Sequence, residues 1–262
     1  MKSSADIIPD NDYEAWLQEF DQRELDAPDR TSMWSLRYCS RMQAVQRFLR
    51  RLPQEARVLE VGASQANASL LAAEAGLQAV ALDRDERALR YAWRKYERGE
   101  FSAVCADALH LPFLPQRFDA VLAMEILEHL PEPPLALAQI REILRPGGLI
   151  IVTTPNADYV NENLPSYEHR PEHLEAMPEA DGSGHLFAFT LRELAELVST
   201  SGFEVLTECY EGSVVMSDKL PLKRLWSPTW LQALSRLLTR LPGTSRLAYG
   251  CFIVARRPMD RQ

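Results

Sequence analysis

The sequence has no paired cysteines and no long apolar run. Cys39, Cys105, Cys209 and Cys251 stand far apart, and none belongs to a C-x-x-C pair. This spacing excludes a zinc knuckle and a thioredoxin-type redox site, so we expect structurally inert thiols. No segment reaches the roughly 18 apolar residues of a membrane span, and the acidic N-terminus lacks the apolar core of a secretory signal. We therefore expect a cytoplasmic protein.

The chain is also short of positive charge. Its 262 residues include 29 basic and 37 acidic side chains, which give a net charge of −8. A charge of this sign repels phosphate backbones and disfavours nucleic-acid partners. Hydrophobic residues make up 46% of the chain and charged residues 25%. This is the composition of a globular protein that can bury a substantial core.

Hydrophobic periodicity divides the chain into a helical N-terminal extension, residues 1–52, and one larger domain, residues 53–262. The extension is polar and acid-rich at first and then predicts a helix from Trp34 to Leu52. From residue 57, short apolar runs alternate with predicted helices at 66–75, 86–98 and 134–144. Such βαβα repetition predicts an α/β fold whose parallel sheet is buried on both faces by helices. Sheets of this kind bind ligands just outside the carboxyl ends of their strands.

Three successive strands are expected to end in groups suited to a nucleoside. Gly62 follows the first strand, in RVLEVGASQA, and permits a sharp turn before a helix. Asp83 ends the second strand, 21 positions after Gly62, where a carboxylate can accept hydrogen bonds from both ribose hydroxyls. Asp107 follows the third and can accept one from an adenine amino group. The alternative interpretation is that Gly62 belongs to an ordinary strand-to-helix turn and that the two aspartates are solvated and bind no ligand. The G-x-G-x-x-G pattern fails, since Ser64 and Asn67 replace its later glycines.

Five ordered strings carry a family resemblance: VLEVG, VALD, CADALHLPF, FDAVLAMEILEHL and LRPGGLIIVTTPN. Together they resemble the class I S-adenosylmethionine-dependent methyltransferases over about residues 57–210. The strings MEILEHLPEP and GHLFAFTLRELAELVSTSGFEV are similar to those of the ubiquinone-biosynthesis O-methyltransferases and the related type 11 methyltransferases. The resemblance implies a Rossmann-like, mostly parallel sheet of seven strands with S-adenosylmethionine as the cofactor.

The resemblance also implies which residues bind this cofactor. Ser64 and Ala66 depart from the pattern, because the family usually has glycines there. Neither adopts a positive φ as cheaply as glycine, which predicts weaker cofactor affinity or an altered loop. The expected cofactor-binding residues are Glu60, Gly62, Ala63, Ser64, Asp83, Arg84, Asp107, Ala108 and Met124.

A cluster of acids and a histidine follows the fourth expected strand. Glu125 and Glu128 share a face if this segment is helical, and His129 comes directly after them. We interpret the three as candidate ligands for Mg²⁺ or Mn²⁺. The E-x-x-E-H string is similar to one implicated in metal binding in ubiquinone-type enzymes and RNA 3′-terminal ribose methyltransferases, which add a downstream histidine, here His185. The alternative is a structural turn that contains His129.

Methyl transfer to a hydroxyl also requires a base. Either His129 or His185 can accept the proton near neutral pH, directly or after a metal has lowered the pKa of the acceptor. The residues do not rank these routes. The same resemblance suggests that Arg37 and Arg41, in the leading helix, bind the carboxylate of the cofactor. The alternative is that both are surface arginines.

Two insertions interrupt the expected sheet. Residues 155–189 form a lid insertion, in which Glu168, His169, Glu172, His173 and Glu175 suggest a second metal site. Without a helical frame their spacing is unspecific, so we interpret them as parts of a solvated lid.

Residues 211–248 form the second insertion, which is basic and amphipathic. Between residues 219 and 246 it holds six basic residues and no acid, so the rest of the chain carries −8 − 6 = −14. An apolar stripe at helical spacing fits contact with an anionic membrane or a lipidic substrate, or packing on the protein's own core or in a dimer. The membrane alternative would make the protein peripheral to the inner face of the membrane. The stripe comprises Trp230, Leu234, Leu237, Leu238 and Leu241.

These observations predict methyl transfer from S-adenosylmethionine to a small molecule. The resemblance favours an oxygen of a hydroxylated aromatic, quinone-like or glycan-related acceptor. One alternative is RNA 3′-end ribose methylation, and another is a degenerate S-adenosylmethionine-binding protein that acts as a partner. A nicotinamide oxidoreductase is disfavoured because the glycine fingerprint fails.

Overall fold

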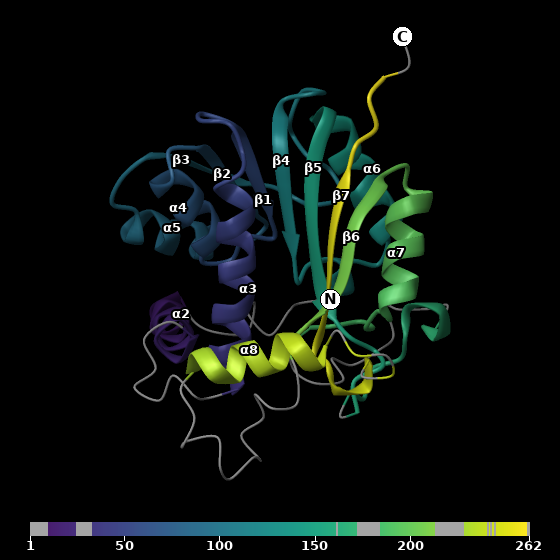
Figure 1. The fold of residues 1–262 in the computed structure, drawn as a ribbon. Coiled ribbons are helices and arrows are strands. Elements are labelled where there is room, and N and C mark those ends of the chain that lie inside the picture. The colour runs from purple at the N-terminus through teal and green to yellow at the C-terminus, as the bar shows by residue number, and fades with distance from the viewer. Residues whose placement is uncertain are drawn as a thin grey trace.

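The computed structural model describes residues 10–24, 33–160, 162–171, 184–212, 228–239, 241, 243 and 245–260. Within them, seven strands form one sheet in the order β3-β2-β1-β4-β5-β7-β6 (Figure 1). The strands are β1 (Arg57–Val61), β2 (Gln78–Asp83), β3 (Glu100–Cys105), β4 (Phe118–Met124), β5 (Leu144–Pro155), β6 (Glu204–Glu211) and β7 (Gly250–Arg256).

Helices in the described residues cover both faces of this sheet. Figure 1 views it from the side of α3, with α6 behind the strands. The helices are α2 (Asp10–Glu24), α3 (Met33–Leu49), α4 (Asn67–Glu74), α5 (Glu86–Lys95), α6 (Pro133–Ile143), α7 (Leu191–Thr200) and α8 (Pro228–Leu238). Three short 3₁₀ turns lie at Leu127–His129, Tyr167–His169 and Ser245–Leu247. The predicted α/β fold is confirmed, and the predicted helix at 34–52 corresponds to α3.

The strand register brings several strand ends to one edge. β1 to β5 pair in parallel, and only β7 runs antiparallel to its neighbours in the sheet. Val61 lies opposite Leu82 and Ala123, and Met124 lies opposite Thr153. The carboxyl ends of β1, β2, β4 and β5 therefore meet at the same level, where the predicted site residues follow them.

The core confirms that the sheet is buried on both sides. On one face, α6 and α7 contribute apolar side chains that are fully covered, such as Leu137 and Val198. On the other face, Val45 and Leu49 of α3 pack with Ala72 of α4. Helix α3 is thus part of the main core, although the sequence places it in an N-terminal extension.

Helix α2 was not predicted, because residues 10–24 are mostly polar. Among its described side chains, Tyr13, Leu17 and Asp21 are buried, and they recur every four residues and so share one face. Tyr13 and Leu17 pack against Ala88 and Tyr91 of α5. Composition alone indicated only a polar, acid-rich segment here, because the face that α2 buries is determined by its contacts with α5.

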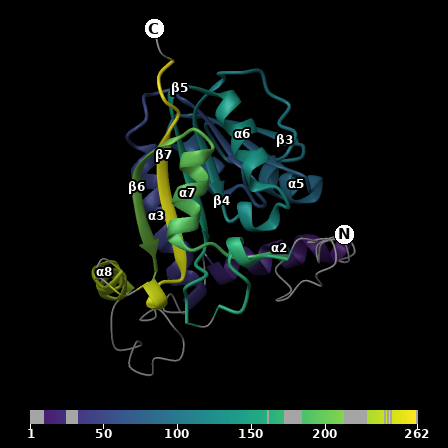
Figure 2. The ribbon, with the colours of Figure 1, turned by 90° about the vertical axis from the view of Figure 1, so that its right-hand side faces the viewer.

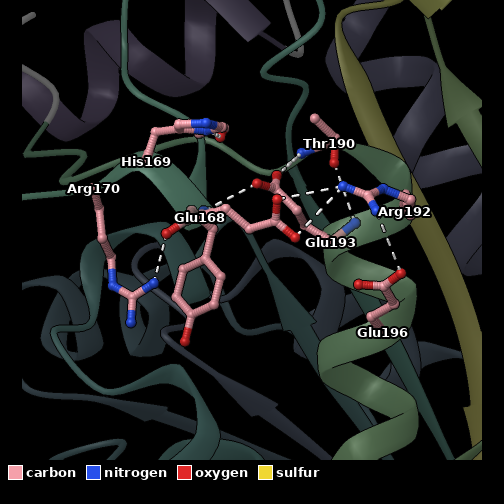
Figure 3. Close-up of polar contacts among 9 residues, drawn as sticks. Glu168, His169, Arg170, Thr190, Arg192, Glu193 and Glu196 are labelled. Atoms are coloured by element: carbon pink, nitrogen blue, oxygen red, sulfur yellow. Dashed lines mark hydrogen bonds and ion pairs between the residues drawn. The ribbon is translucent and has the colours of Figure 1, made fainter.

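The two ends of the lid insertion are fastened to the core and to α7. Phe187 and Phe189 are completely buried, and the Tyr167 ring stacks on Phe189. Figure 3 shows Glu193, in the first turn of α7, between two segments of the chain. Its carboxylate accepts hydrogen bonds from the backbone N–H groups of Thr190, at 2.7 Å, and Glu168, at 3.0 Å. The insertion is therefore tied at both of its described ends.

The suggested second metal cluster is only partly described. Glu168 forms an exposed ion pair with Arg192, and the Ser166 hydroxyl lies 2.8 Å from Nδ1 of His169 (Figure 3). Glu172, His173 and Glu175 lie outside the described residues. The contacts of the two described members are structural, as expected for a solvated lid.

Replacing Glu193 tests this attachment. The hydrogen bonds from Thr190 and Glu168 hold the pKa of Glu193 below its ordinary value, although burial opposes them. Glu193→Gln would turn an NH₂ group toward a backbone N–H, so we expect the free energy of unfolding to fall by about 1–3 kcal/mol. This loss in the free energy of unfolding should be fully present at neutral pH. It should shrink as the pH falls below about 4.3 and through the lowered pKa of folded Glu193.

The matched control is Glu196→Gln on the same helix. Glu196 is exposed, and its carboxylate lies 3.8 Å from a guanidinium nitrogen of Arg192, which is exposed as well, so its loss should cost no more than about 0.5 kcal/mol. Urea unfolding at several pH values measures both variants. Equal effects of the two substitutions would show that Glu193 does not fasten the insertion.

Candidate active site at the carboxyl edge of the sheet

The loop after β1 has the backbone of a glycine-rich turn, although Gly62 is its only glycine. Gly62 has a φ of 70°, and a Cβ there would lie 2.6 Å from Cδ1 of Ile126. Ser64 and Ala66 also have positive φ angles, of 45° and 55°. For residues with a side chain this conformation costs roughly 1–2 kcal/mol each. Ser64 and Ala66, which stand where the family usually has glycines, therefore hold this loop in a strained conformation.

Asp83 holds this loop from the end of β2. Its carboxylate accepts hydrogen bonds from the backbone N–H groups of Ser64, at 2.7 Å, and Asp85, at 2.9 Å. Burial raises the pKa of Asp83, although both hydrogen bonds act in the opposite direction. The carboxylate thus ties the ends of β1 and β2 together at the place expected for a ribose.

Glu60 lies beneath the same loop, inside the protein. Its carboxylate accepts hydrogen bonds from the backbone N–H of Ser69, at 2.8 Å, and from the Ser69 hydroxyl, at 2.6 Å. Burial raises the pKa of Glu60 to about 7 in spite of these partners. Its contacts therefore secure α4 to β1.

The other residues expected to bind the cofactor are spread along the same edge. Ala63 and Ala108 are buried, and Met124 is half-buried at the end of β4. Arg84 and Asp107 are exposed. The arrangement is consistent with a nucleoside across β1, β2 and β3, and the individual contacts stay predictions.

Helix α2 adds residues to this edge that the sequence did not suggest. Asp21 accepts hydrogen bonds from Asn67 at the start of α4, from Tyr91 and from Lys95 of α5. Lys95 is also bonded to the side-chain oxygen of Asn67. This network fixes α2 beside the strained loop.

A second group of side chains lies beyond β4. Glu128, His129 and His185 offer ligand atoms that all lie within 4.8 Å of one another. Glu128 is completely buried, and neither of its carboxylate oxygens has a hydrogen-bond partner in the described part of the chain. Burial and the nearby charge of Glu125 raise the pKa of Glu128 well above its ordinary value. The nitrogen Nε2 of His185 lies 3.8 Å from one of the Glu128 carboxylate oxygens, which is too far for a hydrogen bond, so the cost of burying this carboxyl group is poorly offset.

Glu125, the third predicted ligand, is engaged elsewhere. It lies 3.2 Å from a guanidinium nitrogen of Arg41 and accepts a hydrogen bond from the Thr153 hydroxyl at 2.9 Å. Burial alone would raise the pKa of Glu125, but Arg41 and Arg37 hold it below its ordinary value. The segment is a 3₁₀ turn instead of an α-helix, and Glu125 itself has a φ of 50°. The structure therefore groups His185, and not Glu125, with Glu128 and His129.

The tautomer of His129 follows from its surroundings. Burial and the neighbouring His185 lower the pKa of His129 to about 4, so the ring is neutral at pH 7. Its Nδ1 lies 3.0 Å from the carbonyl oxygen of Gly184, which can only accept a hydrogen bond. The proton must therefore sit on Nδ1, and Nε2 carries a lone pair that can bind a cation or accept a proton.

Residues 33–208 match the model of a methyltransferase-domain family. The chain belongs to this methyltransferase family. Curated relatives include a ubiquinone biosynthesis O-methyltransferase of Leptothrix cholodnii, which is 31% identical over an alignment of 130 residues that covers 43% of this chain and 55% of that protein. A demethylmenaquinone methyltransferase of Renibacterium salmoninarum is 31% identical over 147 residues, 48% and 61% of the two chains. The matches thus span little more than half of these methyltransferases. They confirm the resemblance to the ubiquinone-type group.

Solved structures confirm the fold. The methyltransferase bound to the Trm112 activator of Haloferax volcanii has a TM-score of 0.62 at 17% identity, over 96% of this chain and 98% of that one. The [4+2]-cyclase SpnF has a TM-score of 0.63 at 19% identity, over 99% and 98%. Because a cyclase shares the fold, the fold alone does not determine the reaction.

Ser64→Gly tests the strain in the loop after β1. Glycine adopts a positive φ freely, so we expect this substitution to raise the free energy of unfolding by about 1 kcal/mol. The control is Ser199→Gly on the exposed side of α7, where glycine should lower it by about 0.5–1 kcal/mol. Urea unfolding compares the two. A destabilising effect at both positions would show that Ser64 is not strained.

Proposed function

We propose that this chain transfers a methyl group from S-adenosylmethionine to a hydroxyl oxygen of a small-molecule acceptor. A hydroxylated aromatic, quinone-like or glycan-related compound fits best. The observation that carries the proposal is the buried Glu128, without a hydrogen-bond partner among the described residues, beside His129 and His185. This group follows β4 on the edge that also holds Asp83 and the strained loop. The methyl group of the cofactor and the hydroxyl group of the acceptor would meet at this edge of the sheet.

The chain's own residues supply position and a proton acceptor. Transfer of a methyl group from a sulfonium is an in-line displacement, so catalysis depends mainly on aligning acceptor, methyl and sulfur. Neutral His129 presents the lone pair of Nε2, which can take the proton from the acceptor hydroxyl. His185, whose ring centre lies 4.6 Å from that of His129, is the second candidate for this role.

A divalent cation fits the same group. Glu128 has two buried oxygens to offer, and the histidines add one nitrogen each. One carboxylate with two imidazoles favours Mn²⁺ over Mg²⁺, which prefers oxygen ligands. When bound, such an ion would lower the pKa of an acceptor hydroxyl. Glu128, His129 and His185 would hold it, and Glu125 would stay with Arg41.

The relatives support oxygen as the methylated atom. The Leptothrix protein is named an O-methyltransferase. A second candidate is a protein that binds S-adenosylmethionine without methyl transfer. The strained loop favours that candidate, since it departs from the family's glycines. An acceptor screen that includes a short RNA with a free 3′ ribose separates these functions.

Cofactor binding is tested by thermal shift. A ligand that binds only the folded state at about 100 times its Kd adds roughly 2.7 kcal/mol of stability. We expect this from S-adenosylhomocysteine and nothing from NAD. Asp83→Ala should remove most of the shift. The control Asp119→Ala, at the opposite end of β4, loses the bonds from Arg57 and Arg145 and should keep it.

The contrary result would be a shift with NAD and none with S-adenosylhomocysteine. It would overturn the cofactor assignment. A normal shift without turnover on any acceptor would instead support the binding protein.

Cation binding is tested by the same method without acceptor. Mn²⁺ should raise the unfolding temperature of the wild type, and Glu128→Gln should abolish the increase because the amide removes the anionic ligand. Glu125→Gln is the matched control: it breaks the pair with Arg41 and lowers the starting stability, but the increase with Mn²⁺ should persist. Loss of the increase in Glu125→Gln alone would place the cation at the originally predicted ligand set.

If Mn²⁺ has no effect, direct proton transfer to His129 becomes the favoured route. His129→Ala should then lower kcat by roughly 10²–10⁴ in the presence of EDTA. Full activity of both His129→Ala and Glu128→Gln under these conditions would show that the cluster is structural.

A further inference from the structure

Helix α8 presents an apolar stripe to the surface of the protein. Trp230 is 67% exposed, Leu237 59% and Leu241, just beyond the helix, 49%. Trp230 and Leu237 are seven residues apart, which places them on one side of α8, and the backbone N–H of Leu241 is bonded to the carbonyl of Leu238 at the end of the helix. Among the described side chains of α8, Ser235 is buried and only 1% exposed. The sequence allowed the stripe to pack on the protein's own core. These three residues are too exposed for such packing.

The segment around α8 carries the opposite charge to the rest of the protein. Residues 219–246 hold six basic residues and no acid, against −14 elsewhere. Of the six, Arg246 has a described side chain, and it is exposed. Lys219, Lys223, Arg224 and Arg240 lie outside the described residues, and of Arg236 only the backbone is described. A basic segment with a lone apolar stripe is complementary to an anionic bilayer, whereas the remaining surface would be repelled by it.

The position of α8 relates this surface to the candidate site. The helix lies across the end of the sheet at which β4 and β5 finish, on the side of α3 (Figures 1 and 2). The segment after α8 is fixed to the same end, because the Asn156 amide, directly after β5, donates hydrogen bonds to the carbonyl oxygens of Ser245 and Ala248. The backbone N–H of Val160 donates another to Arg246.

We propose that α8 docks the protein on an anionic lipid surface, with the Trp230–Leu237–Leu241 stripe inserted among the acyl chains. Docking in this way turns the carboxyl edge of the sheet toward the membrane. Among the described residues no helix is long and apolar enough to cross a bilayer, so the contact would be peripheral. The acceptor would then be an apolar, membrane-resident molecule, a part of the inference that rests on the proposed methyl transfer.

Cosedimentation of the full chain with vesicles tests the docking. The vesicles contain equal parts phosphatidylglycerol and phosphatidylcholine, or phosphatidylcholine alone, and neither cofactor nor acceptor is added. We expect binding to the anionic vesicles that weakens between about 0.05 M and about 0.5 M NaCl, because salt screens the basic residues. The triple serine variant, Trp230→Ser, Leu237→Ser and Leu241→Ser together, should bind at least about tenfold more weakly because the inserted surface is lost.

Charge and folding controls complete the experiment. Arg236→Gln, Arg240→Gln and Arg246→Gln should each weaken binding about fivefold at low salt. The matched control replaces Leu114 and Met259, which are 67% and 71% exposed elsewhere on the protein, by serine, and should bind like the wild type. Unfolding temperatures of all variants test whether the fold stays intact, and they should equal that of the wild type.

Undiminished binding of the triple serine variant would overturn the proposal, as would equal binding of the wild type to neutral vesicles. So would a wild-type dimer that binds no vesicles and becomes a monomer in the triple serine variant, since the stripe would then be a contact between copies. Because no cofactor is present, each of these results leaves the proposed methyl transfer untouched. Normal vesicle binding without methyl transfer would reject that reaction alone.

Discussion

The parallel register of β1, β2, β4 and β5 is the constraint on which the candidate site depends. Parallel strands that start at one level also finish at one level, so the groups that follow them meet without any long connection. Gly62, Asp83 and Glu125 come from strands far apart in sequence and reach the same edge only through this pairing. Because helices bury both faces, the acids at this edge lie in a medium of low polarity. The same constraint therefore assembles the site and makes its carboxylates costly to ionise.

The edge is short of positive charge. Burial raises the pKa values of Glu60 and Glu211 to about 7, and it also raises the pKa of Glu128 well above its ordinary value. Arg41 lies between Glu125 and Glu211, at 3.2 Å and 3.7 Å, so one guanidinium faces two acids. The positively charged sulfonium of S-adenosylmethionine or a divalent cation would reduce this imbalance. The electrostatics thus favour cationic ligands over the anionic pyrophosphate of a dinucleotide.

The sequence was most informative where regular spacing repeats over many residues. Alternation of apolar runs and helices predicted the sheet, and the strings after the strands predicted Gly62, Asp83 and the histidine cluster. It could not predict that Glu125 leaves this cluster, because that depends on Arg41, which is 84 positions away along the chain. Nor did it predict α2, whose Asp21 is buried only because Asn67, Tyr91 and Lys95 converge on it. Contacts that cross the sequence, and not local pattern, decide such residues.

The two halves of the site are in direct contact through their strained turns. Gly62 precedes Ser64 and Ala66, and the space that its Cβ would fill is occupied by Ile126, the neighbour of Glu125. All of these turn residues except Ile126 have positive φ angles, a conformation that persists only where the surroundings hold it in place. Asp83 holds the first turn through Ser64, and Arg41 holds the second through Glu125. A ligand that displaced Asp83 or Arg41 from its turn would change the conformation of that turn. Because Ile126 contacts Gly62, the other turn would then have to shift as well.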